Sequence, residues 1–297
     1  MPSPRFVHLR FHSEYSITDG IVRIDPMIHA VLEGGGAAVG ISDLMNVFGG
    51  LRFYTHALAA GLKPILGCDL KVINSKDLNK PFRLGVLCMN HEGYHSLSVL
   101  LTKAFLTNND AARGLVDPKW FDDGGSEGLI ALSGAAQGEL GSLLLGKKWS
   151  LAHEAAERFK AQFPGRFYVE LQRAGRPTDE LATARLANFA VEEQLPVVAT
   201  HPIQFLKPED FEAHEVRCSI AEGYTLQDPR RVKRYTPEQY LKSEAEMCEL
   251  FADIPVAIEN TVEIAKRCNL DGVLSKPQLP LFPTPDGMSL DDYIDQL

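Results

Sequence analysis

Short apolar segments alternate with segments of helical periodicity over about the first 200 residues, and this alternation constrains the fold more than any other feature. The expected strands cover residues 5–10, 37–42, 63–73, 82–89, 128–132, 166–172 and 196–200, and the expected helices cover 26–33, 51–60, 94–105, 149–163 and 179–194. Short apolar strands separated by helices are typical of a mostly parallel sheet or an α/β barrel. From about residue 208 the pattern predicts helix as far as residue 269.

The first expected strand carries polar side chains on one face. In an extended chain His8, Arg10 and His12 point one way, and the apolar side chains between them point the other. Two histidines on one face, with Asp19 in the following loop, would suit a metal pocket. Arg10 is nevertheless a permanent cation without an acceptor atom and cannot coordinate a metal. The segment therefore has the pattern of a metal site that has been disabled.

Composition indicates a folded intracellular protein. With 297 residues and 45% hydrophobic content, the chain can bury a large core, and its 23% charged content is ordinary for globular proteins. Its apolar stretches are far shorter than the roughly 20 residues that span a bilayer, and no basic leader precedes an apolar segment. The five cysteines are scattered, which favours buried reduced thiols over a disulfide framework or a zinc site. We therefore expect a cytoplasmic protein without membrane contact.

The net charge of −9 argues against a dedicated DNA-binding module. One dense cationic run, at residues 230–234, could contact phosphate, but a solvated loop is the preferred interpretation. Three histidines near the expected strands and helices have ordinary structural explanations. We expect His8 to be hydrogen-bonded within its strand, His201 to be a polar strand-end residue and His214 to cap or pack on a helix.

Several segments, taken together and in order, resemble a known family. They are residues 6–20, 40–54 (GISDLMNVFGGLRFY), 63–69 (KPILGCD), 195–205, 213–220 (AHEVRCSI) and 246–268. The chain resembles the PHP (polymerase and histidinol phosphatase) domain at the N-terminus of bacterial DNA polymerase III alpha subunits. The resemblance implies a distorted (β/α)7-type barrel, similar to a TIM barrel, with a helical C-terminal extension. It places the PHP domain at 1–275 and a proline-rich connector, with the start of the polymerase region, at 276–297.

Metal-active members of this family hold a trinuclear cluster with nine ligands. Carried over by position, these ligands fall on Arg10, His12, Asp19, Leu44, Asp69, Arg83, Ala174, Pro202 and Gln204. Only His12, Asp19 and Asp69 keep a good ligand side chain, while Gln204 is a weak neutral substitute. Two guanidinium groups would oppose a nearby dication, so we expect neither a metal cluster nor phosphoesterase activity. A single ion at His12, Asp19 and Asp69 is the alternative.

The two arginines at former ligand positions need partners. We expect Arg10 and Arg83 to pair with Asp19, Asp43 or Asp69, because buried carboxylates would otherwise be uncompensated. Ordinary surface ion pairs are the alternative explanation for these arginines.

The resemblance divides function between this segment and its parent protein. It implies that the parent is a DNA-directed DNA polymerase that uses Mg²⁺, whereas this segment has no cofactor or catalytic residue of its own. The segment is then a silent scaffold that supports the rest of the alpha subunit and binds the proofreading exonuclease (epsilon) subunit of the replicase. DNA would be contacted mainly through the parent. A metal-dependent PHP phosphoesterase and a direct DNA-binding module are the two rival interpretations.

The end of the sequence has a helix-start signal. Ser289 precedes an acidic first turn, as an N-cap residue does, and no C-terminal helix signal follows. We therefore expect a helix to begin here and the sequence to be the front part of a longer polypeptide.

Overall fold

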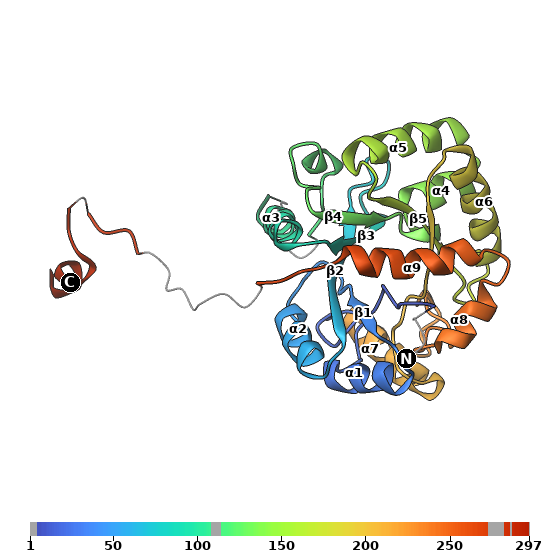
Figure 1. The fold of residues 1–297 in the computed structure, drawn as a ribbon, viewed down its shortest axis with the longest axis horizontal. Helices are drawn as coiled ribbons and strands as arrows, with labels where there is room; N and C mark the ends of the chain where they lie inside the picture. The colour runs from blue at the N-terminus through green and yellow to red at the C-terminus, as the bar shows by residue number, and fades with distance from the viewer. Residues whose placement is uncertain (1–4, 108–113, 273–281, 286, 297) are drawn as a thin grey trace.

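The computed structural model describes residues 5–107, 114–272, 282–285 and 287–296 (Figure 1). Its strands are β1 (Ala38–Ile41), β2 (Lys63–Val72), β3 (Phe82–Cys88), β4 (Leu129–Leu132), β5 (Phe167–Gln172) and β6 (Val197–Thr200). Its α-helices are α1 (Ile24–Glu33), α2 (Gly50–Ala59), α3 (His91–Thr107), α4 (Glu139–Leu145), α5 (Trp149–Gln162), α6 (Asp179–Glu192), α7 (Phe211–Glu222), α8 (Glu244–Leu250), α9 (Pro255–Arg267) and α10 (Leu290–Gln296). Short 3₁₀ helices span Pro118–Phe121, Ala135–Gln137 and Pro208–Asp210.

The six strands form one sheet in the order β1-β2-β3-β4-β5-β6. The pairs β1–β2, β4–β5 and β5–β6 are parallel, whereas β3 runs antiparallel to both of its neighbours. Helices surround the curled sheet (Figure 1). The expected α/β barrel-type fold is confirmed, and the expectation of a mostly parallel sheet holds except at β3.

The N-terminal segment links the two edges of this sheet. Single bridges join His8 to Val39 of β1 and Phe11 to Ile203 just after β6, so the segment completes the barrel where a seventh strand would lie. It is not the regular strand that the sequence predicts. The carbonyl of His8 accepts from Gly40, and that of Phe11 accepts from Ser42, so three residues of the segment match two of β1. The extra residue makes a bulge.

The bulge changes which side chains point inward. Val7 and Leu9 pack in the smaller apolar cluster with Ile65, whereas Phe11 joins the other, larger cluster. His8 turns away and its Nε2 lies 2.7 Å from the carbonyl of Lys242. The prediction that His8 shares a face with the two polar residues after it is therefore wrong, because strict alternation stops at the bulge. The expectation of a hydrogen-bonded His8 is confirmed.

Helix α9 lies over the end of the barrel opposite the polar residues. It runs across the strands in Figure 1, and its Ile264 and Ala265 belong to the same apolar cluster as Val7 and Leu9. The Thr261 hydroxyl of α9 also accepts a hydrogen bond of 2.9 Å from the Val7 backbone N–H. Apolar packing therefore fills this end, and polar side chains are left to the other.

The continuous helical pattern expected after residue 208 is interrupted. Helix α7 ends at Gly223, which has a left-handed φ of 73°, and no helix is present from there to Ser243. Pro229 and Pro237 within this segment disfavour helix. The helical prediction is therefore wrong for this stretch, which instead crosses the polar end of the barrel.

The C-terminal helix begins as expected. The Asp292 backbone N–H donates to the Ser289 hydroxyl at 3.1 Å, so Ser289 caps α10. Residues 276–281, 286 and 297 of the expected connector lie outside the described residues. In the described part of the chain, no helix has both the length and the apolar character needed to cross a bilayer.

Candidate functional site

Polar side chains from several elements meet at the carboxyl ends of the parallel strands. They enclose a cavity of about 70 Å³. Its lining consists of Arg10, His12, Asp19, Arg83, Gly134, Gln137, Gln172, Arg176, Pro202, Gln204, Arg234 and Tyr235. The structure thus brings together residues that are up to 225 positions apart, from Arg10 to Tyr235. Six of the nine predicted cluster positions line this cavity directly.

Arg10 lies between two buried carboxylates. Its Nη2 is 2.6 Å from Asp69 Oδ2, and its Nη1 is 3.1 Å from Glu170 Oε2. Glu170 is fully buried on β5 and also accepts from the Gly134 backbone N–H at 2.9 Å. The guanidinium therefore neutralises carboxylates that would otherwise be strongly destabilising inside the barrel.

Asp69 is the shared acceptor of both arginines. Arg83 Nη1 lies 3.4 Å from the same Oδ2 that Arg10 contacts. Although burial opposes it, the pKa of the Asp69 carboxyl is lowered, because Arg10 and Arg83 favour its charged form. The predicted pairing of these arginines with a neighbouring carboxylate is present, and Asp69 is the carboxylate concerned.

His12 is held between two carboxylates. Its Nδ1 lies 3.1 Å from Asp19 Oδ2, and its Nε2 lies 3.5 Å from Asp69 Oδ2. Burial alone would lower the pKa of His12, but the two carboxylates raise it to about 9. Both ring nitrogens therefore face carboxylates, whose negative charge favours the protonated imidazole.

Asp19 is fixed from three directions. Besides His12, its carboxylate accepts from the Ser16 hydroxyl at 2.7 Å and from the Tyr235 hydroxyl at 3.0 Å. His214 Nε2 lies 2.9 Å from the backbone carbonyl of Asp19. The His214 side chain on α7 is also fully buried with its ring against Tyr235, so the expected packing role is confirmed.

Asp43 pairs with neither Arg10 nor Arg83, both of which the structure describes. Its carboxylate accepts from the Ser13 backbone N–H at 2.6 Å and from the Ser13 hydroxyl at 2.7 Å. Burial raises the pKa of Asp43 to about 6 despite these donors. The hypothesis that Asp43 pairs with Arg10 or Arg83 is therefore wrong, because Ser13 already donates two hydrogen bonds to the Asp43 carboxylate.

The remaining predicted positions contribute little polar chemistry. Leu44 bridges Asp69 through its backbone, and the Ala174 backbone N–H donates to Asp179 at 2.7 Å. Pro202 lines the cavity without a donor atom, and Gln204 Nε2 lies 3.3 Å from His12 Nδ1. None of the four supplies an anionic or imidazole group, so the ligand set of a trinuclear cluster is incomplete.

The arrangement does not fit a metal cluster. Within the described residues, no group of three or more histidine, cysteine, aspartate or glutamate side chains is placed to hold a metal ion. Arg10 occupies the space between Asp69 and Glu170, and the His12 nitrogens face carboxylates. Arg10 and His12 are thus already paired with Asp19, Asp69 and Glu170.

The sequence did not single out four residues of this site. No pattern of metal ligands in the sequence indicates Glu170 or Arg176. Tyr235 lies in the stretch that was expected to be helical. The fourth, Arg234, belongs to the cationic run at 230–234, for which a solvated loop was the preferred interpretation. That interpretation is wrong in part, because Arg234 lines the cavity and the Arg231 side chain is only 3% exposed, paired with Glu215 at 2.7 Å.

Comparison with known protein families decides the classification. A family model described as the PHP domain matches residues 8–174, which is more than half of the chain. The chain belongs to the PHP domain family. The matched residues include most of the nine predicted cluster positions and end before Pro202 and Gln204.

Curated relatives of this PHP domain are alpha subunits of DNA polymerase III. DNA polymerase III subunit alpha of Neisseria meningitidis serogroup B is 48% identical over 299 residues, which covers 100% of this chain and 26% of that protein. The subunits of Pseudomonas aeruginosa and Escherichia coli K12 are 45% and 43% identical, and the alignments cover 97% and 99% of this chain and 25% of each relative. The chain therefore spans about a quarter of the length of the relatives it matches.

Two solved structures show a distant resemblance to the PHP domain. An amidohydrolase from Chromobacterium violaceum has a TM-score of 0.44 at 12% identity, covering 67% of this chain and 87% of that one. A two-domain protein with a predicted PHP-like metal-dependent phosphoesterase, from Bacteroides vulgatus, has a TM-score of 0.45 at 11% identity, covering 86% and 62%.

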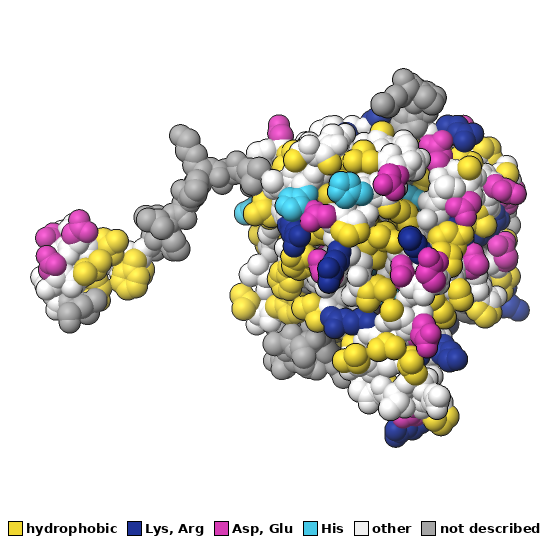
Figure 2. All heavy atoms as spheres, turned by 90° about the horizontal axis from the view of Figure 1, so that it is seen from below, with side chains coloured by type: hydrophobic (Ala, Val, Ile, Leu, Met, Phe, Trp, Pro, Cys, Tyr) yellow, Lys and Arg dark blue, Asp and Glu magenta, His cyan; other side chains and the backbone are white. Residues whose placement is uncertain are grey.

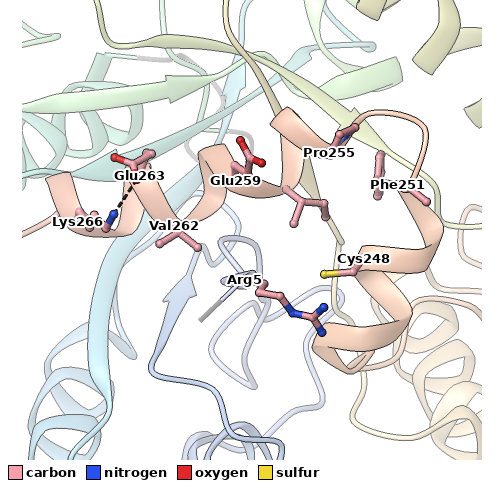
Figure 3. Close-up of a pocket in the computed structure, with 10 residues that line it drawn as sticks. Arg5, Cys248, Phe251, Pro255, Glu259, Val262, Glu263 and Lys266 are labelled. Carbon is pink, nitrogen blue, oxygen red and sulfur yellow. Dashed lines mark hydrogen bonds and ion pairs between the residues drawn. The ribbon is translucent and has the colours of Figure 1, made fainter. Parts of the chain in front are cut away.

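A larger cavity lies elsewhere on the PHP domain. It measures about 430 Å³ and is lined by α8, α9 and the N-terminal Arg5 (Figure 3). Its floor is apolar, with Phe251 and Ile258, and the Glu263–Lys266 pair at one end is 2.7 Å long. The two cavities share no lining residue, so this groove is not part of the candidate site.

The surface charge follows the acidic composition. On the face shown in Figure 2, acidic and basic side chains of the described residues are interspersed with apolar ones instead of forming a basic patch. With a net charge of −9, this face does not have the features of a DNA-binding surface.

Proposed function

We propose that this chain is the PHP region of a bacterial DNA polymerase III alpha subunit, in which it is a catalytically silent, metal-free scaffold located in the cytoplasm. It supports the polymerase region of the same subunit and binds the proofreading exonuclease (epsilon) subunit. Identity of 43–48% to alpha subunits over almost the whole chain supports the assignment. In this proposal nucleotidyl transfer with Mg²⁺, and contact with DNA, belong to the rest of the parent protein.

One observation carries the silent role: the Arg10 guanidinium lies between Asp69 and Glu170. Metal-dependent hydrolysis needs an ion that lowers the pKa of a bound water. A permanent cation that forms ion pairs with the same carboxylates raises the energy of a dication placed there. The three former ligands that keep suitable side chains, His12, Asp19 and Asp69, are already engaged in ion pairs.

The first test is metal content. After incubation with Mn²⁺ or Zn²⁺ and desalting, we expect elemental analysis to find far less than one metal per chain, and no turnover of phosphomonoesters. Stoichiometric retention that disappears in Asp69→Asn would place a functional ion at these residues. The metal-dependent phosphoesterase interpretation would then replace the silent scaffold. Retention that Asp69→Asn leaves unchanged would point to other surface ligands and would not restore the cluster.

The partner needs a separate test. The 297-residue chain, mixed with the exonuclease subunit of its own replicase, should elute with it as one complex in size-exclusion chromatography. If the chain and the exonuclease subunit are both well folded but elute separately, the proposal that they bind each other is wrong. The conclusion about metal content does not depend on this result. Salt-dependent binding of primed template DNA by the chain alone would instead favour the direct DNA-binding interpretation.

A further inference from the structure

The segment 224–235 crosses the polar end of the barrel and forms part of the cavity wall there. It follows Gly223, which ends α7 with a left-handed φ of 73°. Its last two residues, Arg234 and Tyr235, line the cavity, and the Tyr235 hydroxyl donates to Asp19 at 3.0 Å. Movement of this segment away from the barrel would therefore open the cavity to solvent.

Apolar packing contributes little to holding this segment in place. Arg231 is its only buried residue, whereas its aliphatic side chains are exposed, Leu226 at 36% and Val232 at 62%. Burial of apolar surface is the main favourable contribution to folding. A segment with few buried apolar contacts depends on its polar contacts and can open while the rest of the protein stays folded.

A buried ion pair attaches the segment to α7. Arg231 Nη1 is 2.7 Å from Glu215 Oε2, and the two side chains are 3% and 8% exposed. Arg234 Nη1 lies 3.2 Å from Glu222 Oε1, but the Arg234 side chain is 60% exposed, and such pairs contribute little. The Arg231–Glu215 pair therefore decides how firmly the segment is held.

This ion pair is also suited to release. Arg231 Nε and Glu215 Oε1 are buried without a hydrogen-bond partner. Water would hydrogen-bond to both atoms once the segment moved away, which offsets part of the lost attraction. The closed and open arrangements are thus closer in free energy than a fully satisfied buried pair would allow.

The ends of the segment define which residues can move. At Gly223 a Cβ would meet no atom within 4 Å, so the backbone is free to turn there. At the other end the Thr236 hydroxyl donates to the Ala174 carbonyl, and Gln239 Nε2 donates to the Pro202 carbonyl at 3.1 Å. The chain after residue 235 is therefore fixed to the barrel.

We propose that residues 224–235 are a lid over the cavity at the carboxyl ends of the strands, with the Arg231–Glu215 pair as its latch. The lid opens locally, while the barrel stays folded, and opening separates Tyr235 from Asp19. The proposal concerns access to the cavity and does not depend on the metal-free state in the proposed function.

Cys218 reports on this opening without an added probe. It lies on α7 between Glu215 and Glu222, on the same face of the helix. The Arg231 side chain spans these two carboxylates, with its Nε 3.8 Å from Glu222 Oε2. Cys218 is only 4% exposed in this arrangement. Movement of Arg231 away from α7 therefore exposes the thiol.

The test is alkylation of the folded 297-residue chain with N-ethylmaleimide, followed by peptide mass spectrometry that resolves each cysteine. Cys88 and Cys268 are 0% and 1% exposed in the two apolar clusters, so they become accessible only when the barrel itself opens. In the unmodified chain we expect Cys218 to react faster than both, because the lid opens more often than the barrel unfolds.

Arg231→Gln should accelerate the alkylation of Cys218 at least about tenfold, because it removes one partner of a buried ion pair. Arg230→Gln is the matched control. Arg230 belongs to the same segment, but its side chain is 76% exposed and pairs with Asp228. This variant changes the net charge equally and should leave the Cys218 rate unchanged.

Ile130→Val separates local opening from unfolding of the barrel. Ile130 is fully buried on β4 in the smaller apolar cluster, and loss of one methylene there destabilises the barrel without changing the lid. Cys88 and Cys268 should then react faster, while Cys218 keeps its rate. Equal acceleration of all three thiols would overturn the proposal, because Cys218 would then be exposed only by global unfolding.

The other outcomes are equally decisive. The proposal is wrong if Cys218 reacts no faster than Cys88 and Cys268 in the unmodified chain. It is also wrong if Arg231→Gln leaves the Cys218 rate unchanged or accelerates it no more than the control does. If Arg231→Gln does not fold, Glu215→Gln must show the acceleration instead. Failure here leaves the proposed function unaffected, because that function is tested by metal content and by exonuclease binding.

Discussion

Replacement of Arg10 by methionine should lower the free energy of unfolding by about 3–5 kcal/mol, the range found when one partner of a buried ion pair is removed. The Arg10 side chain is 7% exposed, and its partners Asp69 and Glu170 are 5% and 0% exposed. Methionine retains much of the volume but leaves two carboxylates without their shared cation. Denaturant unfolding followed by circular dichroism measures the loss.

Arg52→Met is the matched control for this experiment. Arg52 also pairs with an aspartate, Asp25, at 3.0 Å, but the two side chains are 46% and 42% exposed. Exposed pairs contribute about 0–1 kcal/mol, so this variant should unfold almost like the unmodified chain. Adding Glu170→Gln to Arg10→Met should recover part of the loss, because one uncompensated charge is removed. Equal, small losses for both arginine variants would show that Arg10 does not stabilise the barrel interior.

The sequence was sufficient for the order of most elements up to β6, because helix and strand periodicities differ and the longer segments show one of them clearly. It missed α4, whose seven residues are too few to show a helical period. It failed at the N-terminal segment for a local reason. One extra residue at the bulge opposite Gly40 and Ser42 reverses the alternation, and no residue type in the segment signals it. It failed again after Gly223, where the periodicity of α7 and α8 was extended across a connecting segment that contains two prolines.

Residues of the site could be predicted from the sequence only at positions where metal-active members of the PHP family carry a ligand. That comparison located Arg10, Arg83 and Asp69, and charge compensation correctly predicted that they pair. Glu170 could not be found in this way, because a lone glutamate in an apolar strand gives no pattern until its contact with Arg10 is known. Long-range charge contacts of this kind depend on the tertiary fold, as does the approach of Tyr235 to Asp19.

Acidification should destabilise the chain through His8, and His8→Gln should reduce this effect. Burial lowers the pKa of His8 from 6.5 to about 4, so the folded state keeps it neutral while the unfolded state takes up a proton. Its contribution to stability is present above pH 6.5 and is lost as the pH falls toward 4. Between pH 7 and pH 4.5 the loss from this residue is about 2 kcal/mol.

The environment of His8 explains why protonation is resisted. Its Nε2 faces the Lys242 carbonyl at 2.7 Å, and its ring lies edge-on to Phe6 with centroids 4.7 Å apart. The Glu246 carboxylate favours the charged form of His8, but burial outweighs it. A glutamine amide can still donate to the Lys242 carbonyl and does not titrate.

The measurement is the slope of unfolding free energy against pH, compared between variants. Other groups also contribute, because burial lowers the pKa of His201 to about 3 and raises that of Asp43 to about 6, with opposite effects on stability in acid. The Asp43 contribution is shared by all variants and cancels in the comparison. The pKa of His201 is lowered mainly by burial and next by His8, so His8→Gln also relieves part of the His201 shift and changes the slope in the same direction. His29→Gln, which changes an exposed histidine on α1, should keep the slope of the unmodified chain, whereas His8→Gln should flatten it. Equal slopes in the two variants would mean that His8 is protonated in the folded state at pH 4.5, and that burial beside Lys242 does not suppress its charge.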